Sequence, residues 1–392
     1  MNFVLNIPKG TDMTEQKHLN YIDTINFGSY YTPSNLVDIV YDMIKKNVLN
    51  WYTYNIVDTS CGYGNFLRFP NSIGADFDKT AIYEAQRQTN DCLFYCHNSL
   101  MNVNRKQYGL SNNDKIIIVG NPPYNDTTSI IRNDIKSDVC MIDEDIRHRD
   151  LGVSFLLSYE KLEADYVCIL HPLSYLIKKA NFDSLNRFKN NYKLIDAVII
   201  SSGEFQNTSK TTHFPIIIAL YKRDKKGMSY NFIQNYTFKT KDNKTFEIGK
   251  FDKLCNYITK YPNHKHLSLD DSVAFFWTMR DINALKRTKT FIEHEVYNSI
   301  RVSKEKLSLY CYADVFKEYI PHIPYYFGNS DIMINYDSFK RIEKSFLRKS
   351  LSKYPFLRGL LYEDNVTEND MVNINTYFYN LLGEHYVDKQ FR

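Results

Sequence analysis

Two short motifs combine polar side chains with residues that control the backbone, which is typical of ligand-binding turns. The first, DTSCGYGNF, runs from residue 58 to residue 66, and the second, NPPY, runs from residue 121 to residue 124. Each follows an apolar run that predicts a buried strand. Because the carboxyl ends of parallel strands meet at one edge of a sheet, we expect the two motifs to lie close together.

The first motif predicts a nucleoside site. Gly62 and Gly64 permit positive φ angles and a close approach of the backbone to a ligand. The next predicted strand ends at Asp76, and a carboxylate about 20 residues along can accept hydrogen bonds from both ribose hydroxyls. The dinucleotide signature G-x-G-x-x-G is absent, since Leu67 stands in place of its third glycine. This favours a nucleoside over a dinucleotide, and a plain tight turn is the alternative.

The second motif predicts a site that holds an amino group. Two prolines stiffen the turn and fix the direction of the Asn121 side chain. The Asn121 Oδ1 and the Pro122 carbonyl can then accept hydrogen bonds from one amino group, while the Tyr124 ring offers a face to a planar molecule. The alternative is a proline turn that only leads out of a strand.

These motifs require a sheet that presents its strand ends on one side. Apolar runs alternate with helical patterns between residues 55 and 221, which predicts a mostly parallel α/β sheet covered on both faces. The predicted strands are 55–58, 72–76, 93–97, 115–119, 165–171, 194–201 and 214–221. The predicted helices are 79–88, 153–163, 180–190 and one capped by Ser34 or Asn35. The last two strands have no helix between them and are predicted to pair antiparallel at a sheet edge.

The alternation stops after residue 226, where we predict a domain boundary. Residues 227–392 carry 24 basic and 20 acidic residues, whereas the preceding part has 25 of each. This excess favours a polyanionic partner. A basic series at helical spacing either contacts phosphates or forms a solvated face. Its members are Lys340, Arg341, Lys344, Arg348, Lys349 and Lys353. The polar segment 126–150 is predicted to be a loop.

Composition excludes several protein classes. With 43% hydrophobic and 24% charged residues in a chain of 392, the sequence is neither disordered, collagen-like nor a coiled coil. No apolar run reaches the ~18 to 20 residues of a membrane helix, so we expect a soluble, cytoplasmic protein without a membrane partner. Seven cysteines without a CxxC pattern argue against a disulfide framework or a zinc site.

Taken together, the motifs resemble those of amino-methyltransferases that methylate adenine N6 in DNA for restriction–modification systems. The order resembles the family's gamma arrangement, in which cofactor motifs precede the catalytic NPPY and a target-recognition domain follows both. The resemblance covers about residues 30–222. It implies a Rossmann-like seven-stranded S-adenosylmethionine-dependent methyltransferase sheet in a catalytic domain, residues 1–226, and a C-terminal α+β DNA target-recognition domain, residues 227–392.

The resemblance also implies roles for individual residues. Asn121, Pro122 and Tyr124 would be catalytic, and Tyr124 and Phe205 would stack on the flipped base, with His213 and Phe214 as rivals for the role of Phe205. The cofactor, S-adenosylmethionine, would contact Thr32, Asp58, Cys61, Gly62, Gly64, Asp76, Asn98 and Asn121. Thr59 departs from the family's usual proline, and Asn98 stands where the family usually has aspartate.

The implied chemistry is transfer of a methyl group to an exocyclic nitrogen without a metal ion. By accepting both amino hydrogens, Asn121 and Pro122 would localise the nitrogen lone pair for attack on the sulfonium methyl. The partner would be double-stranded DNA, from which the target adenine is flipped out, and a cognate restriction endonuclease would act separately. Two alternatives stay open: a protein-glutamine or RNA methyltransferase with the same motif, and an inactive DNA-binding relative.

Overall fold

The computed structural model describes residues 31–89, 91–124, 141–205, 212–360 and 365–388. By its contacts the chain divides into two compact units. The first contains the described residues up to Phe246 except 212–215, and the second contains residues 212–215 and the described residues from Glu247 onward. The division that we predicted after residue 226 precedes this boundary, because two short strands after it join the sheet of the first unit.

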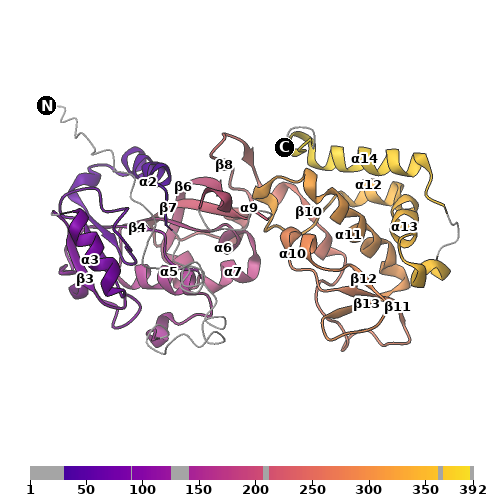
Figure 1. Cartoon of the computed structure of the whole chain (residues 1–392), viewed down its shortest axis with the longest axis horizontal. Coiled ribbons are helices and arrows are strands. Elements are labelled where there is room, and N and C mark those ends of the chain that lie inside the picture. Colours follow the sequence, from indigo (N-terminus) through magenta and orange to yellow (C-terminus); the bar gives the residue numbers. More distant parts are fainter. Residues whose placement is uncertain (1–30, 90, 125–140, 206–211, 361–364, 389–392) are drawn as a thin grey trace. The chain divides into compact units, whose positions relative to one another are not determined.

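The first unit is built on one nine-stranded sheet with the order β3-β2-β1-β4-β5-β7-β6-β8-β9 (Figure 1). Its strands are β1 (Asn55–Asp58), β2 (Ile73–Asp76), β3 (Leu93–Cys96), β4 (Ile116–Gly120), β5 (Tyr166–Pro172), β6 (Tyr192–Ser201), β7 (Pro215–Arg223), β8 (Phe238–Thr240) and β9 (Thr245–Phe246). The first seven correspond to the seven predicted strands. The Rossmann-like α/β fold class is therefore confirmed.

The strand order places the predicted motifs beside one another. Strand β1 pairs in parallel with both β2 and β4, and β4 pairs in parallel with β5. The order reverses between β1 and β4, the point outside which open α/β sheets bind their ligands at the carboxyl ends of the strands. Asp58, Asp76 and Gly120 are the last residues of β1, β2 and β4, so all three lie at this edge.

The far side of the sheet differs in two respects from the prediction. Strands β6 and β7 are neighbours, as predicted, but β7 lies between β5 and β6 and is antiparallel to β5, so it is not at an edge. Strands β8 and β9 continue the sheet beyond β6. We did not predict them because they are only three and two residues long, too short to show an alternating pattern.

Seven helices are described in the first unit. They are α2 (Ser34–Asn47), α3 (Lys79–Gln88), α5 (Leu151–Lys161), α6 (Ser174–Ile177), α7 (Lys179–Ser184), α8 (Arg187–Asn191) and α9 (Tyr230–Gln234). The predicted helix 180–190 is divided into α7 and α8, because Asn186 adopts a φ of +44°, which a continuous helix does not accommodate. The predicted cap of α2 is also wrong: Pro33 precedes the helix, and neither Ser34 nor Asn35 caps it.

The second unit is an α+β structure with two small sheets, as expected for the C-terminal part. Strands β10 (Asp252–Lys253) and β14 (Met333–Ile334) form one sheet, and β12 (Phe291–Ile292), β11 (Ser272–Trp277) and β13 (Ser299–Ser303) form the other. Its helices are α10 (Ile282–Arg287), α11 (Leu307–Tyr319), α12 (Tyr336–Arg341), α13 (Glu343–Leu351) and α14 (Glu368–Leu382).

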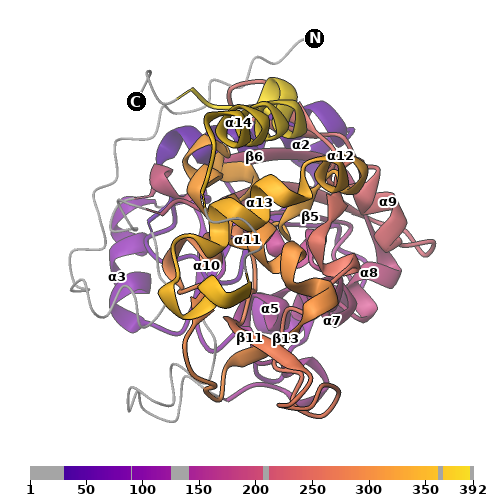
Figure 2. The same cartoon turned by 90° about the vertical axis from the view of Figure 1, so that its right-hand side faces the viewer.

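Aromatic side chains form the core between three of these helices. Tyr312 of α11 lies against Phe346 of α13 and Phe378 of α14, with ring centroids 5.1 and 5.9 Å away, and the three helices run close together in Figure 2. Much of the high aromatic content of this part of the chain therefore serves packing. Among the described residues, no helix has the length and apolar character needed to cross a membrane.

Candidate functional site

A cavity of about 500 Å³ opens at the carboxyl ends of β1, β2 and β4 in the first unit. Its lining includes Asp76 after the first motif and Asn121 of the second. It also includes five of the other residues predicted to contact a cofactor, namely Thr32, Asp58, Cys61, Gly62 and Asn98. The two motifs, which are at least 55 residues apart in the sequence, thus contribute to one cavity.

The glycine turn orients Asp76. Gly62 and Gly64 have φ angles of +51° and +84°, the conformation for which glycine is suited. The turn brings the Gly62 N–H within 2.9 Å of Asp76 Oδ2, and the Asp78 N–H donates to Asp76 Oδ1 at 3.0 Å. Burial raises the pKa of Asp76, while these backbone donors lower it. Cys61 is buried beside the turn, and burial raises the pKa of its thiol, so it is unsuited to act as a nucleophile.

Asp58 is a buried carboxyl group at the end of β1, only 1% exposed. The pKa of Asp58 is raised to about 8, mainly by burial. The neighbouring Asp76 also raises this pKa, whereas the hydrogen bond that the Ser60 N–H donates to Oδ1 at 3.1 Å lowers it. The group is therefore mostly neutral at pH 7. Gly120 makes room for it: a Cβ atom there would lie 2.7 Å from Asp58 Oδ1, and the φ of Gly120 is +141°. We did not predict this requirement for glycine directly before NPPY.

Hydrogen bonds connect Asn121 with Thr32. The Asn121 Nδ2 donates to Thr32 Oγ1 at 3.1 Å, and the Tyr124 hydroxyl donates to Asn121 Oδ1. Thr32 is buried, and its backbone carbonyl accepts a hydrogen bond from Asn65 Nδ2 at 3.1 Å. The structure thus brings together the predicted residues Thr32, Asn121 and Tyr124, and adds Asn65. Pro122 is buried, and Gly64, Pro122 and Tyr124 support the site without lining the cavity.

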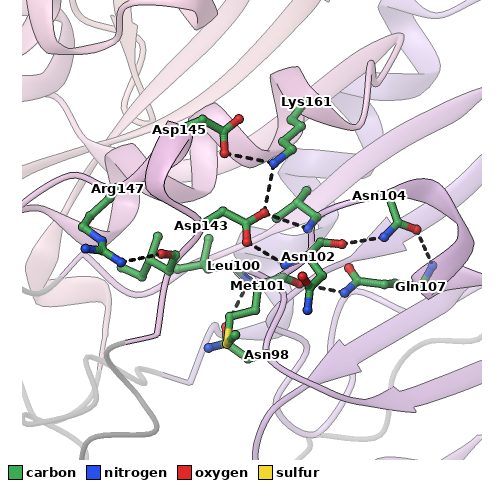
Figure 3. Close-up of polar contacts among 12 residues, drawn as sticks. Asn98, Leu100, Met101, Asn102, Asn104, Gln107, Asp143, Asp145, Arg147 and Lys161 are labelled. Atoms are coloured by element: carbon green, nitrogen blue, oxygen red, sulfur yellow. Dashed lines mark hydrogen bonds and ion pairs between the residues drawn. The ribbon is translucent and has the colours of Figure 1, made fainter.

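Asn98 is held in place by backbone groups on both sides. Its Oδ1 accepts from the Leu100 N–H at 3.0 Å, and its Nδ2 donates to the Met141 carbonyl at 2.8 Å. Figure 3 shows the neighbouring contacts, in which the two carboxylate oxygens of Asp143 accept from the N–H groups of Asn102 and Val103 at 2.7 and 3.0 Å.

A lysine strengthens the same segment. Lys161 Nζ lies 2.9 Å from both Asp143 Oδ2 and Asp145 Oδ1 (Figure 3). Residues 141–146 thereby fix the turn that follows β3 beside the cavity. We predicted this stretch only as part of the loop 126–150, of which residues 126–140 lie outside the described residues.

Several apolar residues that we did not predict also line the cavity. Phe77, directly after Asp76, is 48% exposed and lines the cavity, as do Tyr31, Leu151 and Phe155. Leu151 and Phe155 are four residues apart on α5, so they share one face of that helix. The spacing of Leu151 and Phe155 could have indicated that both line the cavity. The place of Phe77 directly after Asp76 could have indicated the same for Phe77.

The three candidates for stacking on a base lie outside this cavity lining. Phe205 is buried, with 4% of its surface exposed, and the residues that follow it, 206–211, lie outside the described part. His213 and Phe214 belong by their contacts to the second unit, where the His213 carbonyl accepts a hydrogen bond from Asn283 Nδ2 at 3.1 Å. Which of them stacks on a base stays a prediction.

The predicted basic series is largely engaged in ion pairs. Arg348 forms two hydrogen bonds to the buried Asp370, at 2.6 and 2.9 Å. Lys340 pairs with Glu343 at 2.6 Å and Lys349 with Glu318 at 3.4 Å. Lys353 pairs with Asp314 and Glu318. Four of the six cations in the predicted series therefore pair with acidic residues of the second unit. They are Lys340, Arg348, Lys349 and Lys353.

Solved structures similar to this chain include the methyltransferase subunit of a type I restriction–modification system from Streptococcus thermophilus. It shares 14% identity over 57% of this chain and 48% of that one, with a TM-score of 0.38. A DrdV–DNA complex matches at 14% identity, over 57% of this chain and 28% of that one, with a TM-score of 0.37.

A TehB-like S-adenosylmethionine-dependent methyltransferase from Corynebacterium glutamicum is similar at 12% identity. It covers 49% of this chain and 98% of that one, with a TM-score of 0.25. No protein-family model matches the chain, and no curated protein does either. Similarities this distant do not identify a function, which has to be argued from the cavity itself.

Proposed function

We propose that the protein is an S-adenosylmethionine-dependent DNA methyltransferase that modifies adenine N6. The observation that carries the proposal is the single cavity lined by both Asp76 and Asn121. A carboxylate beside a glycine turn suits a ribose, and an asparagine in a proline turn suits an amino group. A methyl donor and its acceptor could thus meet in one cavity of about 500 Å³, within the usual range for ligand sites.

The residues of the cavity fit the proposed cofactor. Two buried polar atoms have no hydrogen-bond partner among the described residues and belong to cavity-lining side chains, namely Ser60 Oγ and Asn65 Oδ1. Such atoms are costly unless a ligand or water satisfies them. Thr32, Asp58, Cys61, Gly62, Gly64, Asp76, Asn98 and Asn121 would hold the cofactor, which supplies an electrophilic methyl group when bound.

The chain's own part in the reaction is to grip and orient the acceptor amine. Asn121 Oδ1 accepts a hydrogen bond from the Tyr124 hydroxyl in this structure, and the same oxygen would accept one amino hydrogen of the substrate. The Pro122 carbonyl would accept the other. With both hydrogens held, the nitrogen lone pair is directed away from the ring, and positioning provides most of the rate enhancement. The Tyr124 ring would stack on the base.

The second unit is the proposed DNA target-recognition domain. Residues 227–392, most of which belong to this unit, hold the chain's excess of basic residues, and phosphate contacts give DNA-binding proteins much of their affinity. Because most cations of the series on α12 and α13 pair with acidic residues, DNA contacts are to be sought at Arg341, Lys344 and elsewhere. A separate restriction endonuclease would complete a restriction–modification system.

The proposal is tested with S-adenosylmethionine that carries a labelled methyl group. Purified protein is incubated with double-stranded DNA, RNA and a protein extract, and we expect label only in the adenines of DNA. Label in RNA or glutamine would overturn the substrate assignment, and no label in any pool would overturn the activity.

A substitution tests the mechanism. Asn121→Ala should reduce transfer by at least about 100-fold, a size typical for the loss of a group that stabilises the transition state. S-adenosylhomocysteine should still bind, because the other seven residues proposed to hold the cofactor remain. Asn112→Ala is the matched control, since Asn112 is exposed in the loop before β4. Transfer by Asn121→Ala at the wild-type rate would contradict the assigned role.

A further inference from the structure

We propose that three cations around α10, namely Arg280, Arg287 and Lys289, bind the phosphate backbone of double-stranded DNA. The inference rests on the proposed function and deepens it, because it names the part of the second unit that meets the polyanion. The three residues, which we call the α10 surface, lie shortly before α10, at its last residue and two residues beyond it. All three are exposed.

The excess positive charge of residues 227–392 is concentrated in this short segment. Residues 280–289 contain four basic residues and one acidic residue, an excess of three, whereas residues 227–392 contain 24 and 20, an excess of four. The nearest acidic residues along the chain on either side are Asp271 and Glu293. Lys286, the fourth cation, already has an interaction partner in the chain. A local field of one sign attracts an oppositely charged partner.

The cations of the α10 surface are not neutralised by the protein. Among the described residues, no acidic side chain forms an ion pair with Arg280, Arg287 or Lys289. Arg287 Nε donates to the Asn283 carbonyl oxygen at 3.2 Å, a contact that leaves its charge uncompensated. Asp281, the one acid of the segment, caps α10, where its Oδ1 accepts from a backbone N–H of the first turn at 2.8 Å.

The basic series on and after α13 differs in this respect. Arg348 pairs with Asp370 and Lys353 with Asp314, and both carboxylates are buried. Moving either cation to a phosphate would leave a buried charge without its partner, which is costly. An exposed cation without a partner has no such cost, and its contact with DNA releases a counterion. Phosphates should therefore bind the α10 surface in preference to this series.

Two further side chains adjoin the α10 surface. The Trp277 backbone N–H, at the end of β11, donates to the Thr290 carbonyl at 2.8 Å, which places Trp277 beside the residue that follows Lys289. Its side chain is half-buried and makes no ring contact with another aromatic residue among those described. Lys317 of α11 donates to the Thr288 carbonyl at 2.5 Å. The surface therefore has a further cation nearby and a natural fluorescent reporter.

The salt dependence of DNA binding tests the proposal. Fluorescence anisotropy of a labelled DNA duplex of mixed sequence gives the Kd of the full chain between about 50 and 200 mM salt. Each phosphate contact adds about 0.9 to the slope of log K against log salt, so Arg287→Gln/Lys289→Gln should make the slope shallower by about 2 and Arg280→Gln by about 1. An unchanged slope in Arg287→Gln/Lys289→Gln would overturn the proposal.

Lys304→Gln/Lys306→Gln is the matched control. It also removes two exposed charges that are two residues apart, from the short 3-10 helix Lys304–Lys306 before α11. Helix α11 has 13 residues, a length of about 20 Å, and Lys317, which contacts Thr288, is in its last turn. The control therefore lies at the opposite end of α11 and should keep the wild-type slope. An equal loss in the control would overturn the assignment to α10.

Tryptophan fluorescence provides a second measurement that does not depend on removing charge. The chain has two tryptophans, so Trp277 is the remaining one in Trp51→Phe. Its emission should change when the duplex is added to saturation, because DNA on the α10 surface alters the surroundings of the half-buried indole. Unchanged emission at saturation would overturn the proposed position of the DNA.

The wild type distinguishes failure of this inference from failure of the proposed function. Tighter binding of RNA than of duplex DNA would overturn the choice of partner. A wild type that binds no nucleic acid would overturn the inference together with the proposed DNA substrate. A wild type that binds DNA through the α10 surface but transfers no methyl group would overturn the proposed activity and support this inference.

Discussion

The buried carboxyl group of Asp58 gives the protein a pH dependence of stability that a single substitution should remove. Asp58 is 1% exposed, and burial raises its pKa to about 8 in the folded protein, whereas an aspartate in an unfolded chain has a pKa of about 3.9. Between pH 4 and pH 8 the folded state therefore holds a proton that the unfolded state has released. Folding stability must fall as the pH rises through this window, because the unfolded state binds fewer protons.

The magnitude follows from this one-proton difference. Within the window, each pH unit lowers the stability of the wild type by roughly 1 kcal/mol through Asp58. Asp58→Asn has no charge to bury, and its amide oxygen can still accept from the Ser60 N–H. Relative to wild type, the free energy of unfolding of the variant should therefore increase by roughly 2 kcal/mol between pH 5 and pH 7. For a unit of this size that corresponds to about 4–8 °C in melting temperature.

The assay is thermal unfolding of the cofactor-free protein between pH 5 and pH 9, followed for wild type, Asp58→Asn and a control. Asp42→Asn serves as the control, because Asp42 has an exposed side chain on α2. This substitution removes the same charge as Asp58→Asn. The difference in melting temperature between Asp58→Asn and wild type should grow with pH and level off above pH 8. The difference between Asp42→Asn and wild type should not show this dependence. A difference that stays constant from pH 5 to pH 9 would refute the neutral state of Asp58.

Two further substitutions test how the cavity is built. Gly120→Ala places a Cβ atom 2.7 Å from Asp58 Oδ1 at a φ of +141°, so it should cost about 2 kcal/mol or more in unfolding experiments; unchanged stability would contradict the close packing. Asp143→Asn leaves one acceptor oxygen for two backbone N–H groups and removes the charge that faces Lys161. It should weaken nucleoside binding several-fold in calorimetry, whereas Asp145→Asn, at a more exposed carboxylate, should have a smaller effect.

Much of the sheet could be predicted from the sequence because its information is local. Apolar runs such as 116–120 and 166–172 are continuous enough to mark buried parallel strands. Strand order is a different kind of information. The pairing of β7 with β6 was predicted from the absence of a helix between them, but its pairing with β5 joins distant segments, and no pattern within 215–223 shows it.

The site shows the same distinction between local and distant information. Asp58, Asp76 and Asn121 each end or directly follow a strand, so the parallel sheet alone was sufficient to predict that they lie together. The role of Asp143 was not predictable, because its partners Asn102 and Val103 are about 40 residues away in the sequence. Arg348 was placed in a basic series by its helical spacing, but Asp370 on another helix engages it.

Buried polar groups of this protein are satisfied by protein partners in some places and left unpaired in others. In the second unit the buried Asp314 accepts hydrogen bonds from Thr290, Tyr354, Ser350 and Lys353, which offsets the cost of burying its charge. Ser60 and Asn65, by contrast, each leave a buried atom unpaired in residues that line one cavity. A ligand that satisfies these atoms binds the folded state alone and stabilises it. Unpaired polar atoms are therefore expected in a cavity that binds a polar ligand. A cavity without a ligand function would gain no stability from them.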